Sequence, residues 1–325
     1  MQKENVSSAV PRIAVVLPAY NEELTIADTI RDFATHLPEA RIYVINNNSK
    51  DKTGPIAREV LAGLGNAGGV IDELRQGKGN ALRRAFHSID ADVYVLADAD
   101  MTYPASRARD LIAPIVENRA DMVVGDRHSG GHYARENTRS LHGFGNALVQ
   151  HAVNTLFSAK LVDIMSGYRV FSRAFVKSYP ILVEGFQIET DMTLHALHKR
   201  FRIVEIPVEY KDRPAGSFSK LNTLSDGAKV IFTIAQILRY YRPLMFFGSL
   251  ALLASLLGVL SAVPVLIDWF SYKYIYHVPL AVLAASLEIF AIVLLAIGLI
   301  LDSLSHQQRL QFERSLLAGT DAYRS

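Results

Sequence analysis

Residues 91–104, ADVYVLADADMTYP, join an apolar run to two carboxylates, Asp98 and Asp100, which are separated by one small residue. The run at 93–97 is short and rich in valine, which is typical of a buried strand. Residues two apart in an extended segment point the same way. One interpretation is that one of these acids caps the helix that Pro104 can begin. The other is that the pair holds a divalent metal, Mg²⁺ or Mn²⁺, together with a substrate's phosphates.

Strands and helices alternate through the first 210 residues. Short apolar strands rich in Val and Ile are expected at 13–17, 41–45, 93–97 and 122–125. Helices are expected between and after them, at 23–35, 55–64, 80–88 and 105–118. This alternation predicts an α/β domain with a mostly parallel sheet flanked by helices on both faces. Such sheets bind ligands beyond the carboxyl ends of their strands, where Asp98 and Asp100 are expected.

Three other polar segments lie next to predicted strands or helices, namely LPAYNEE at 17–23, INNNSKDKTG at 45–54 and RQGKGNA at 75–81. Each alone is explained as a turn, because Asn, Asp and Gly form turns readily. In the third segment, Gly77 and Gly79 flank Lys78 just before a helix, where backbone and helix N-terminus favour an anion. Together on one sheet edge, the segments indicate a nucleotide site with Lys78 near a phosphate.

Two runs of 24 residues, 244–267 and 278–301, contain a single charged residue, Glu288. About 20 apolar residues suffice to cross a bilayer as a helix, so two transmembrane helices are expected. The alternative is a pair of buried helices in a soluble protein. An acid inside a membrane needs a partner, and the candidates for Glu288 are a second subunit's helix or the path of a lipid. Paired spans of this kind suit a homo-oligomer.

The flanks of these runs predict the orientation and the domain layout. The loop at 268–277 is rich in aromatic residues, which favour the membrane interface, and contains one Lys, against six Lys and Arg residues at 211–242. The positive-inside rule then places the catalytic domain and the tail in the cytoplasm. The expected layout is a catalytic domain at 1–220, amphipathic juxtamembrane helices at 221–243, two transmembrane helices within 244–302 and a tail at 303–325.

The overall composition excludes several classes of protein. The net charge is +2, which provides no field for nucleic-acid binding. The chain has no cysteine, so disulfides and thiolate metal sites are excluded.

Six motifs, in order along nearly the whole chain, resemble those of the family 2 glycosyltransferases, and more closely the polyprenyl-phosphate glycosyltransferases of the dolichol-phosphate mannosyltransferase type. The motifs are PAYNE at 18–22, NNSKD at 47–51, GKG at 77–79, DAD at 98–100, DIMSGYR at 163–169 and RPAGSFSK at 213–220. The resemblance implies a GT-A domain at the inner (plasma) membrane. That domain would transfer a monosaccharide, with inversion, from a UDP- or GDP-sugar to undecaprenyl or dolichyl phosphate, giving a lipid-linked donor for envelope glycan or lipid modification.

The resemblance also implies a role for each matching residue. The donor would be bound by Pro18, Tyr20, Glu22, Asn47, Asp51, Lys78 and Asp98. The metal would be held by Asp100 and Asp98. Phosphates would be bound by Arg169, Arg213, Ser219 and Lys220. The catalytic candidates are Asp100, Arg213, Glu189 and Asp191.

The helix expected after residue 188 carries four polar residues with open roles. Glu189 and Asp191 are candidates for contacts with sugar hydroxyls or for an auxiliary base, and the alternative is that they only complement the charge of the helix N-terminus. His195 and His198 are interpreted as a solvated helix face rather than as a metal pair.

Two departures from the family pattern leave the donor nucleotide and the metal open. Acids often begin the second motif in relatives, whereas this chain has Asn46–Asn48, and some relatives have Gln where this chain has Thr102.

Two other functions are considered. A processive polysaccharide synthase would carry Gln-x-x-Arg-Trp, which QILRY at 236–240 imitates imperfectly. A catalytically inactive membrane scaffold would bind nucleotide sugars without transferring them.

Overall fold

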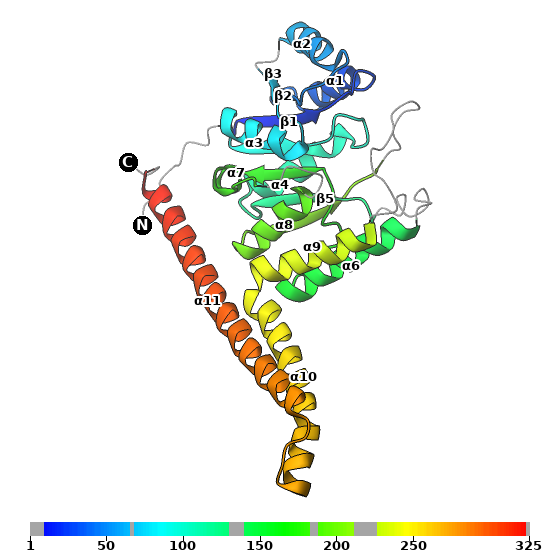
Figure 1. Cartoon of the computed structure of the whole chain (residues 1–325). Coiled ribbons are helices and arrows are strands. Elements are labelled where there is room, and N and C mark those ends of the chain that lie inside the picture. Colours follow the sequence, from blue (N-terminus) through cyan, green and yellow to red (C-terminus); the bar gives the residue numbers. More distant parts are fainter. Residues whose placement is uncertain (1–9, 66–67, 130–139, 183–187, 211–225, 323–325) are drawn as a thin grey trace. The chain divides into compact units, whose positions relative to one another are not determined.

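The computed structural model describes residues 10–65, 68–129, 140–182, 188–210 and 226–322 (Figure 1). The chain forms two compact units, Met1–Thr223 and Leu224–Ser325. The first unit contains the sheet, and the second contains the long apolar helices.

The first unit is built on a seven-stranded sheet with the strand order β3-β2-β1-β4-β6-β5-β7. The strands are β1 Ile13–Ala19, β2 Arg41–Asn46, β3 Gly69–Asp72, β4 Val93–Leu96, β5 Met122–Asp126, β6 Arg169–Ser172 and β7 Ile203–Pro207. Strand β6 is antiparallel to its two neighbours, and all other pairs are parallel. The predicted mostly parallel sheet is therefore confirmed. The carboxyl ends of β1, β2, β4 and β5 share one edge, which the loop leading into β6 also reaches.

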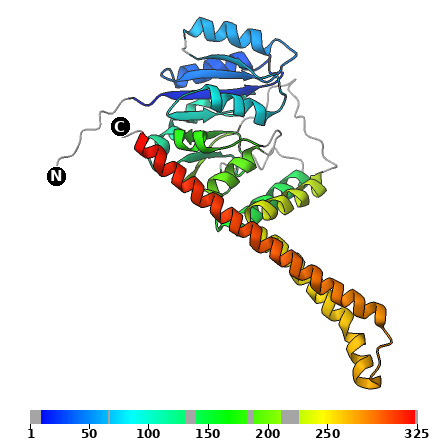
Figure 2. The same cartoon turned by 60° about the vertical axis from the view of Figure 1, so that its left-hand side comes forward.

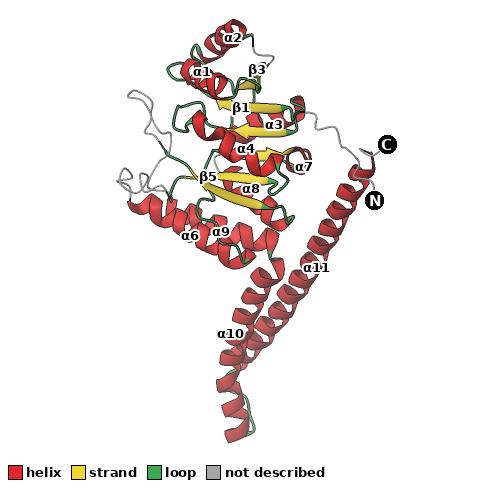
Figure 3. Ribbon diagram, turned by 180° about the vertical axis from the view of Figure 1, so that it is seen from behind, coloured by secondary structure: helices red, strands yellow, loops and turns green. Residues whose placement is uncertain are grey.

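Helices cover both faces of this sheet (Figure 3). They are α1 Ile26–His36, α2 Thr53–Leu64, α3 Lys78–Ser88, η1 Ala105–Arg107, α4 Ala108–Val116, α7 Arg173–Ser178 and α8 Ile188–His198. Helix α6 Ser140–Phe157 packs against α8. Alternate strand residues face two separate cores, because side chains alternate along a strand. Val15 of β1 packs with α1, α2 and α4 in one core, whereas Val16 packs with α3, α7 and α8 in the other.

The second unit consists of α9 Asp226–Tyr241, α10 Pro243–Tyr272 and α11 Val278–Ala322. The last two helices lie side by side as an antiparallel hairpin (Figure 2). Both are long and apolar enough to cross a membrane. Helix α11 continues well past residue 301, where the predicted span ends, because residues 302–318 contain neither proline nor glycine to stop it.

The partner of Glu288 is on the neighbouring helix of the same hairpin. The hydroxyl of Ser255 in α10 donates to the Glu288 carboxylate at 3.0 Å. A Cβ on Gly258, one turn further, would lie 2.7 Å from Glu288 Oε1. The buried residues of these two spans are mostly small: Ala251, Ala254 and Gly258 on α10, and Ala284 and Ala291 on α11. Glu288 is therefore accommodated by a notch in α10, and this contact needs neither a second subunit nor a lipid.

We expect Gly258→Leu to separate the two helices, because a side chain there has no space beside Glu288. Overpacking of this kind costs about 1–3 kcal/mol. Gly258 faces Glu288, and Gly298 faces Phe247, so Ala254 is inferred to lie near Ala291. In this cysteine-free chain, cysteines placed at 254 and 291 should form a disulfide that Gly258→Leu prevents. Gly248→Leu is the control, because nothing lies within 4 Å of a Cβ there. Equal cross-linking in the two variants would contradict the notch.

Candidate active site

Asp98 and Asp100 lie directly beyond β4, at the edge where the parallel strands end. The Asp98 side chain is 29% exposed, whereas Asp100 is buried. Met101 has a φ of 64°, in the left-handed region, and this turn brings Thr102 back onto Asp100. The Thr102 hydroxyl donates to Asp100 Oδ1 at 2.6 Å, and the Thr102 amide donates to the same oxygen at 3.2 Å. Thr102 therefore fixes the orientation of Asp100.

Lys78 joins Asp98 to an acid from a distant part of the chain. Its Nζ lies 2.5 Å from Asp98 Oδ1 and 2.6 Å from Glu189 Oε1, at the start of α8. Burial alone would lower the pKa of Lys78, but the charges of the two carboxylates outweigh burial and raise the pKa above its ordinary value. The predicted contact of Lys78 is a phosphate, and in this structure its ammonium contacts two carboxylates.

Gly167 lies against the other face of Asp98. A Cβ added there would be 2.6 Å from Asp98 Oδ2, which is closer than real Cβ atoms come. The Gly167 amide donates to the Tyr103 hydroxyl at 3.0 Å, so the backbone is held in this position. The motif at 163–169 thus reaches the candidate site through a glycine, whose lack of a side chain leaves room for Asp98.

Asn47 holds the turn from which Lys78 projects. Its side chain is buried, its Oδ1 accepts from the Gly77 amide at 2.8 Å, and its Nδ2 donates to the Arg75 carbonyl at 2.7 Å. Gly77 itself has a φ of 128°, which residues with a side chain rarely adopt, and α3 begins immediately after it. Because this position must both accept and donate, an amide fits where an ionised carboxylate could only accept. This explains why a neutral amide is suited to position 47.

The first two strand ends are tied together through Thr53. The Thr53 hydroxyl accepts from the Glu22 amide at 2.8 Å and donates to Asp51 Oδ1 at 2.5 Å. Pro18, at the end of β1, and Tyr20 are partly exposed at the same edge. The structure therefore brings these four predicted donor-binding residues to one end of the sheet, and their contact with a nucleotide stays a prediction.

Asp191 lies away from Glu189, although only one residue separates them. Successive helical residues are rotated by about 100°, so two residues apart face nearly opposite directions. Glu189 faces Lys78, whereas Asp191 accepts a hydrogen bond from the Tyr179 hydroxyl at 2.6 Å. The structure brings Glu189 to the site and leaves Asp191 outside it.

The predicted phosphate contact of Arg169 stays a prediction, and in this structure the side chain contacts protein groups. Arg169 is fully buried in β6, and its guanidinium donates to the carbonyls of Ser166 and Ile164 and to the Thr193 hydroxyl. Burial also lowers the pKa of this guanidinium. Arg169 therefore supports the turn that carries Gly167. The other three predicted phosphate ligands lie outside the described residues: Arg213, Ser219 and Lys220.

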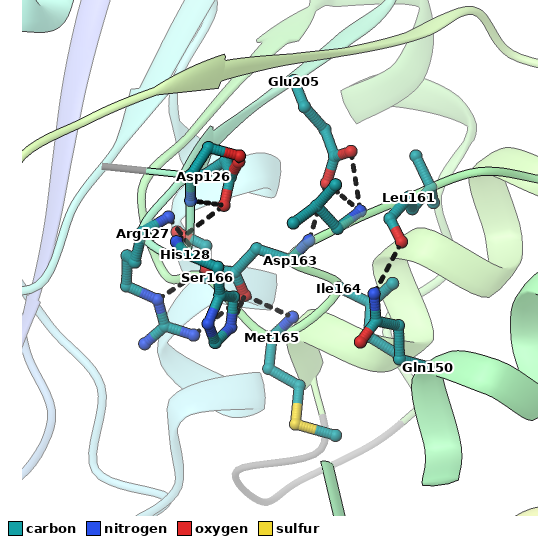
Figure 4. Close-up of polar contacts among 12 residues, drawn as sticks. Asp126, Arg127, His128, Gln150, Leu161, Asp163, Ile164, Met165, Ser166 and Glu205 are labelled. Atoms are coloured by element: carbon teal, nitrogen blue, oxygen red, sulfur yellow. Dashed lines mark hydrogen bonds and ion pairs between the residues drawn. The ribbon is translucent and has the colours of Figure 1, made fainter. Parts of the chain in front are cut away.

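A buried ion pair that the sequence did not reveal supports the same loop (Figure 4). Arg127, just past β5, donates to both oxygens of Asp163 at 2.7 and 2.9 Å, and their side chains are 12% and 1% exposed. Burial alone would raise the pKa of Asp163, but Arg127 outweighs it and lowers that pKa. Glu205 accepts from the amides of Val162 and Asp163 (Figure 4). The sequence feature that could have indicated this ion pair is the charged pair Asp126 and Arg127, which directly follows the strand predicted at 122–125.

His195 is buried among aromatic rings, so the interpretation of this residue as part of a solvated face is wrong. Its ring lies 4.9 Å from that of Tyr179 and 5.7 Å from that of Phe175, measured between centroids. The positively charged form of the ring is disfavoured in this apolar surrounding. Burial lowers the pKa of His195 from 6.5 to about 4.

We expect acid to destabilise the fold through His195. As the pH falls, the unfolded chain binds the proton first, so the free energy of unfolding decreases between the ordinary pKa of 6.5 and about 4. At about 1.4 kcal/mol per pKa unit, the loss is up to about 3 kcal/mol. Denaturant unfolding at about pH 7.5 and about pH 5 should show a smaller difference for His195→Phe than for the wild type. His87→Gln, at an exposed position, is the control. An unchanged pH dependence in His195→Phe would contradict the assignment.

The acids beyond β4 suit a metal that is shared with a substrate. Within the described ranges, no three His, Cys, Asp or Glu side chains form a group that could hold a metal ion. Mg²⁺ in proteins is commonly bound by one or two carboxylates plus substrate phosphates and waters. Asp100 and Asp98 match that donor set, so the residues present fit a divalent cation held partly by a nucleotide diphosphate.

The strand order and the flanking helices form a GT-A-like α/β fold. The structure of glucosyl-3-phosphoglycerate synthase from Mycobacterium tuberculosis, in complex with Mn²⁺, UDP-glucose and phosphoglyceric acid, superposes with a TM-score of 0.53. The two chains are 21% identical, and the match covers 70% of this chain and 79% of the other. At that identity, the likeness shows the fold alone.

The family model described as "Glycosyl transferase family 2" matches residues 14–179. The chain therefore belongs to glycosyl transferase family 2 and is a glycosyltransferase. Glycosyltransferase AglJ of Haloferax volcanii is 29% identical over 306 residues, which cover 93% of this chain and 96% of that protein. Polyprenol monophosphomannose synthase of Mycolicibacterium smegmatis is 26% identical, over 69% of this chain and 86% of that protein. Undecaprenyl-phosphate mannosyltransferase of Micrococcus luteus is 25% identical, over 63% of this chain and 86% of that protein.

Proposed function

We propose that this protein transfers a monosaccharide from a UDP- or GDP-sugar to a polyprenyl phosphate, with inversion at the anomeric carbon. The observation that carries the proposal is the pairing of two features in one chain. Asp98 and Asp100 form an acidic site at the strand ends, and α10 and α11 form an apolar hairpin suited to a bilayer. The relatives from Mycolicibacterium smegmatis and Micrococcus luteus, which are named for polyprenyl-phosphate acceptors, support the same acceptor class.

The chemistry of a phosphate acceptor agrees with the residues at the site. A phosphate monoester is largely dianionic at neutral pH, so its oxygen can attack the anomeric carbon without a strong general base. The new bond forms between that oxygen and the anomeric carbon while the bond to the donor's β-phosphate breaks, and the nucleoside diphosphate leaves. When bound, a divalent cation offsets the charge of the leaving group. Asp100, oriented by Thr102, is the residue proposed to hold that cation.

The charge pattern supports a catalytic unit on the cytoplasmic side of the inner membrane. The six Lys and Arg residues at 211–242 stand directly before the first span, against one Lys in the loop between the spans. In this arrangement, residues 1–220 form the catalytic domain and 221–243 the amphipathic connection. An acceptor phosphate at the membrane surface would then be on the same side as the nucleotide sugar.

Product formation in detergent tests the proposal. The purified full chain would be incubated with undecaprenyl phosphate, Mn²⁺ or Mg²⁺ and a panel of labelled UDP- and GDP-sugars. We expect label in the organic phase from one donor, and none when EDTA is added or when undecaprenol replaces the phosphate. Label that stays in the aqueous phase with every donor, while nucleotide still binds, would contradict the proposal and favour a scaffold that only binds nucleotide sugars.

A further inference from the structure

The ammonium group of Lys78 lies between two acids of the candidate site, Asp98 and Glu189. It lies within 2.6 Å of oxygens from both Asp98 and Glu189, and its side chain is 13% exposed. Asp100 follows Asp98 by two residues at the same strand end. One cation thus partly neutralises Asp98 and Glu189, beside the strand end where a metal shared with the substrate is proposed to bind.

We propose that Lys78 is a built-in counter-cation that keeps the metal site weak until the nucleotide-sugar donor arrives. The proposal rests on the proposed function, in that it takes the donor to be a nucleoside diphosphate sugar used with a divalent cation. In the free protein, Lys78 forms ion pairs with Asp98 and Glu189, and its positive charge repels a divalent metal ion. The donor's diphosphate then supplies the negative charge that allows the metal and Lys78 to be present together.

The chain fixes Lys78 in this place through its backbone. Lys78 is the first residue of α3, and the preceding Gly77 is held by Asn47 through a 2.8 Å hydrogen bond to its amide. Asn47 also holds the Arg75 carbonyl, so the turn is restrained on both sides. The ammonium can change partners by rotating its side chain, but its Cα stays beside the acids.

The electrostatic effect of one fixed charge at this range is large. Two like charges a few ångströms apart repel strongly enough, at an effective dielectric constant of about 20, to weaken cation binding by about tenfold or more. A diphosphate group next to the metal reverses this balance because it carries at least two negative charges. Metal binding and donor binding are therefore expected to reinforce each other, and such coupling is reciprocal between the two ligands.

This arrangement also gives Glu189 a role different from that of a catalytic base. The oxygen of Glu189 that faces the site is bonded to Lys78 at 2.6 Å. We assign Glu189 as a positioning residue that holds the ammonium between α8 and Asp98. Its replacement by glutamine should then raise the KM for the donor more than it lowers kcat, with the shape of the pH–rate profile unchanged.

The test measures Mn²⁺ binding to the purified full chain in detergent, without acceptor and without turnover. The EPR signal of free Mn²⁺ reports how much metal is unbound. Lys78→Met should bind Mn²⁺ at least about tenfold more tightly than the wild type when no nucleotide is present. Lys78→Arg, which keeps the charge, should resemble the wild type. Lys160→Met removes an exposed lysine and should leave the affinity unchanged. If Lys78→Met does not fold, Lys78→Gln serves as the second uncharged variant.

Adding UDP or GDP gives the second half of the test. Nucleotide should tighten Mn²⁺ binding to the wild type by a larger factor than in Lys78→Met, because the variant has lost the charge that the diphosphate offsets. Nucleotide-free Mn²⁺ affinity in Lys78→Met that is no higher than in the wild type would overturn the proposal. Since no acceptor is present, the result is independent of whether the acceptor is a polyprenyl phosphate.

Discussion

Replacement of Asp100 by asparagine is expected to lower glycosyl transfer by about a thousandfold or more. Asparagine can still accept the hydrogen bonds of Thr102 through its carbonyl oxygen, so the turn at 100–102 should survive. What is lost is the negative charge that would hold the cation beside the leaving diphosphate. Charge stabilisation of this kind is worth several kcal/mol, and each 1.36 kcal/mol corresponds to about tenfold in rate.

Initial rates at saturating metal and donor check this expectation, with circular dichroism as the measure of folding. Asp28→Asn is the matched control, because Asp28 is exposed and pairs locally with Arg31 in α1. Its rate should equal that of the wild type. An Asp100→Asn variant that turns over normally at ordinary metal concentrations would exclude Asp100 from the site.

Gly167→Ala is expected to lower activity by about a hundredfold or more. The new Cβ would lie 2.6 Å from Asp98 Oδ2, so the carboxylate or the loop must move. Asp98 is held by Lys78 at 2.5 Å, and the Gly167 backbone is held by Tyr103 at 3.0 Å. Neither side can yield without breaking a contact at the site, and a misplacement of about 1 Å can reduce a rate about a hundredfold.

Gly63→Ala provides the control for this substitution. Gly63 lies in α2, and nothing is found within 4 Å of a Cβ placed there. Activity and stability should be retained, with a small gain from the better helix propensity of alanine. Full activity in Gly167→Ala would contradict this prediction, because it would show that Asp98 can move without loss of function.

The main features of the sheet could be predicted because local patterns determine them. The valine-rich runs of β1, β2, β4 and β5 ended within one or two residues of their predicted positions. The strands that were not predicted were β3, β6 and β7, whose apolar residues are bounded or interrupted by a charged residue, Asp72, Arg169 and Glu205 respectively. The helix predicted at 105–118 is divided into η1 and α4, with Pro114 inside the last turns of α4.

Side-chain partners far apart in the sequence could not be predicted. Lys78 and Glu189 are separated by 111 residues, and no local pattern reports that they meet. Arginine is almost never fully buried unless it is paired, so the position of Arg169 within the core ran against expectation. The role of Asn47 becomes clear only from the structure. The turn at 75–77 needs both a hydrogen-bond donor and an acceptor, and the Asn47 amide provides both.

The central claim is that the protein transfers the sugar alone, without phosphate, to a polyprenyl phosphate. The identity of the released nucleotide tests this claim most directly. Purified protein would be given undecaprenyl phosphate and the accepted donor, and both the lipid product and the nucleotide would be analysed by mass spectrometry. Transfer of the sugar alone predicts release of the nucleoside diphosphate and a lipid that gains one sugar while keeping a single phosphate. A nucleoside monophosphate, together with a lipid diphosphate sugar, would show that a sugar phosphate is transferred instead and would contradict the account.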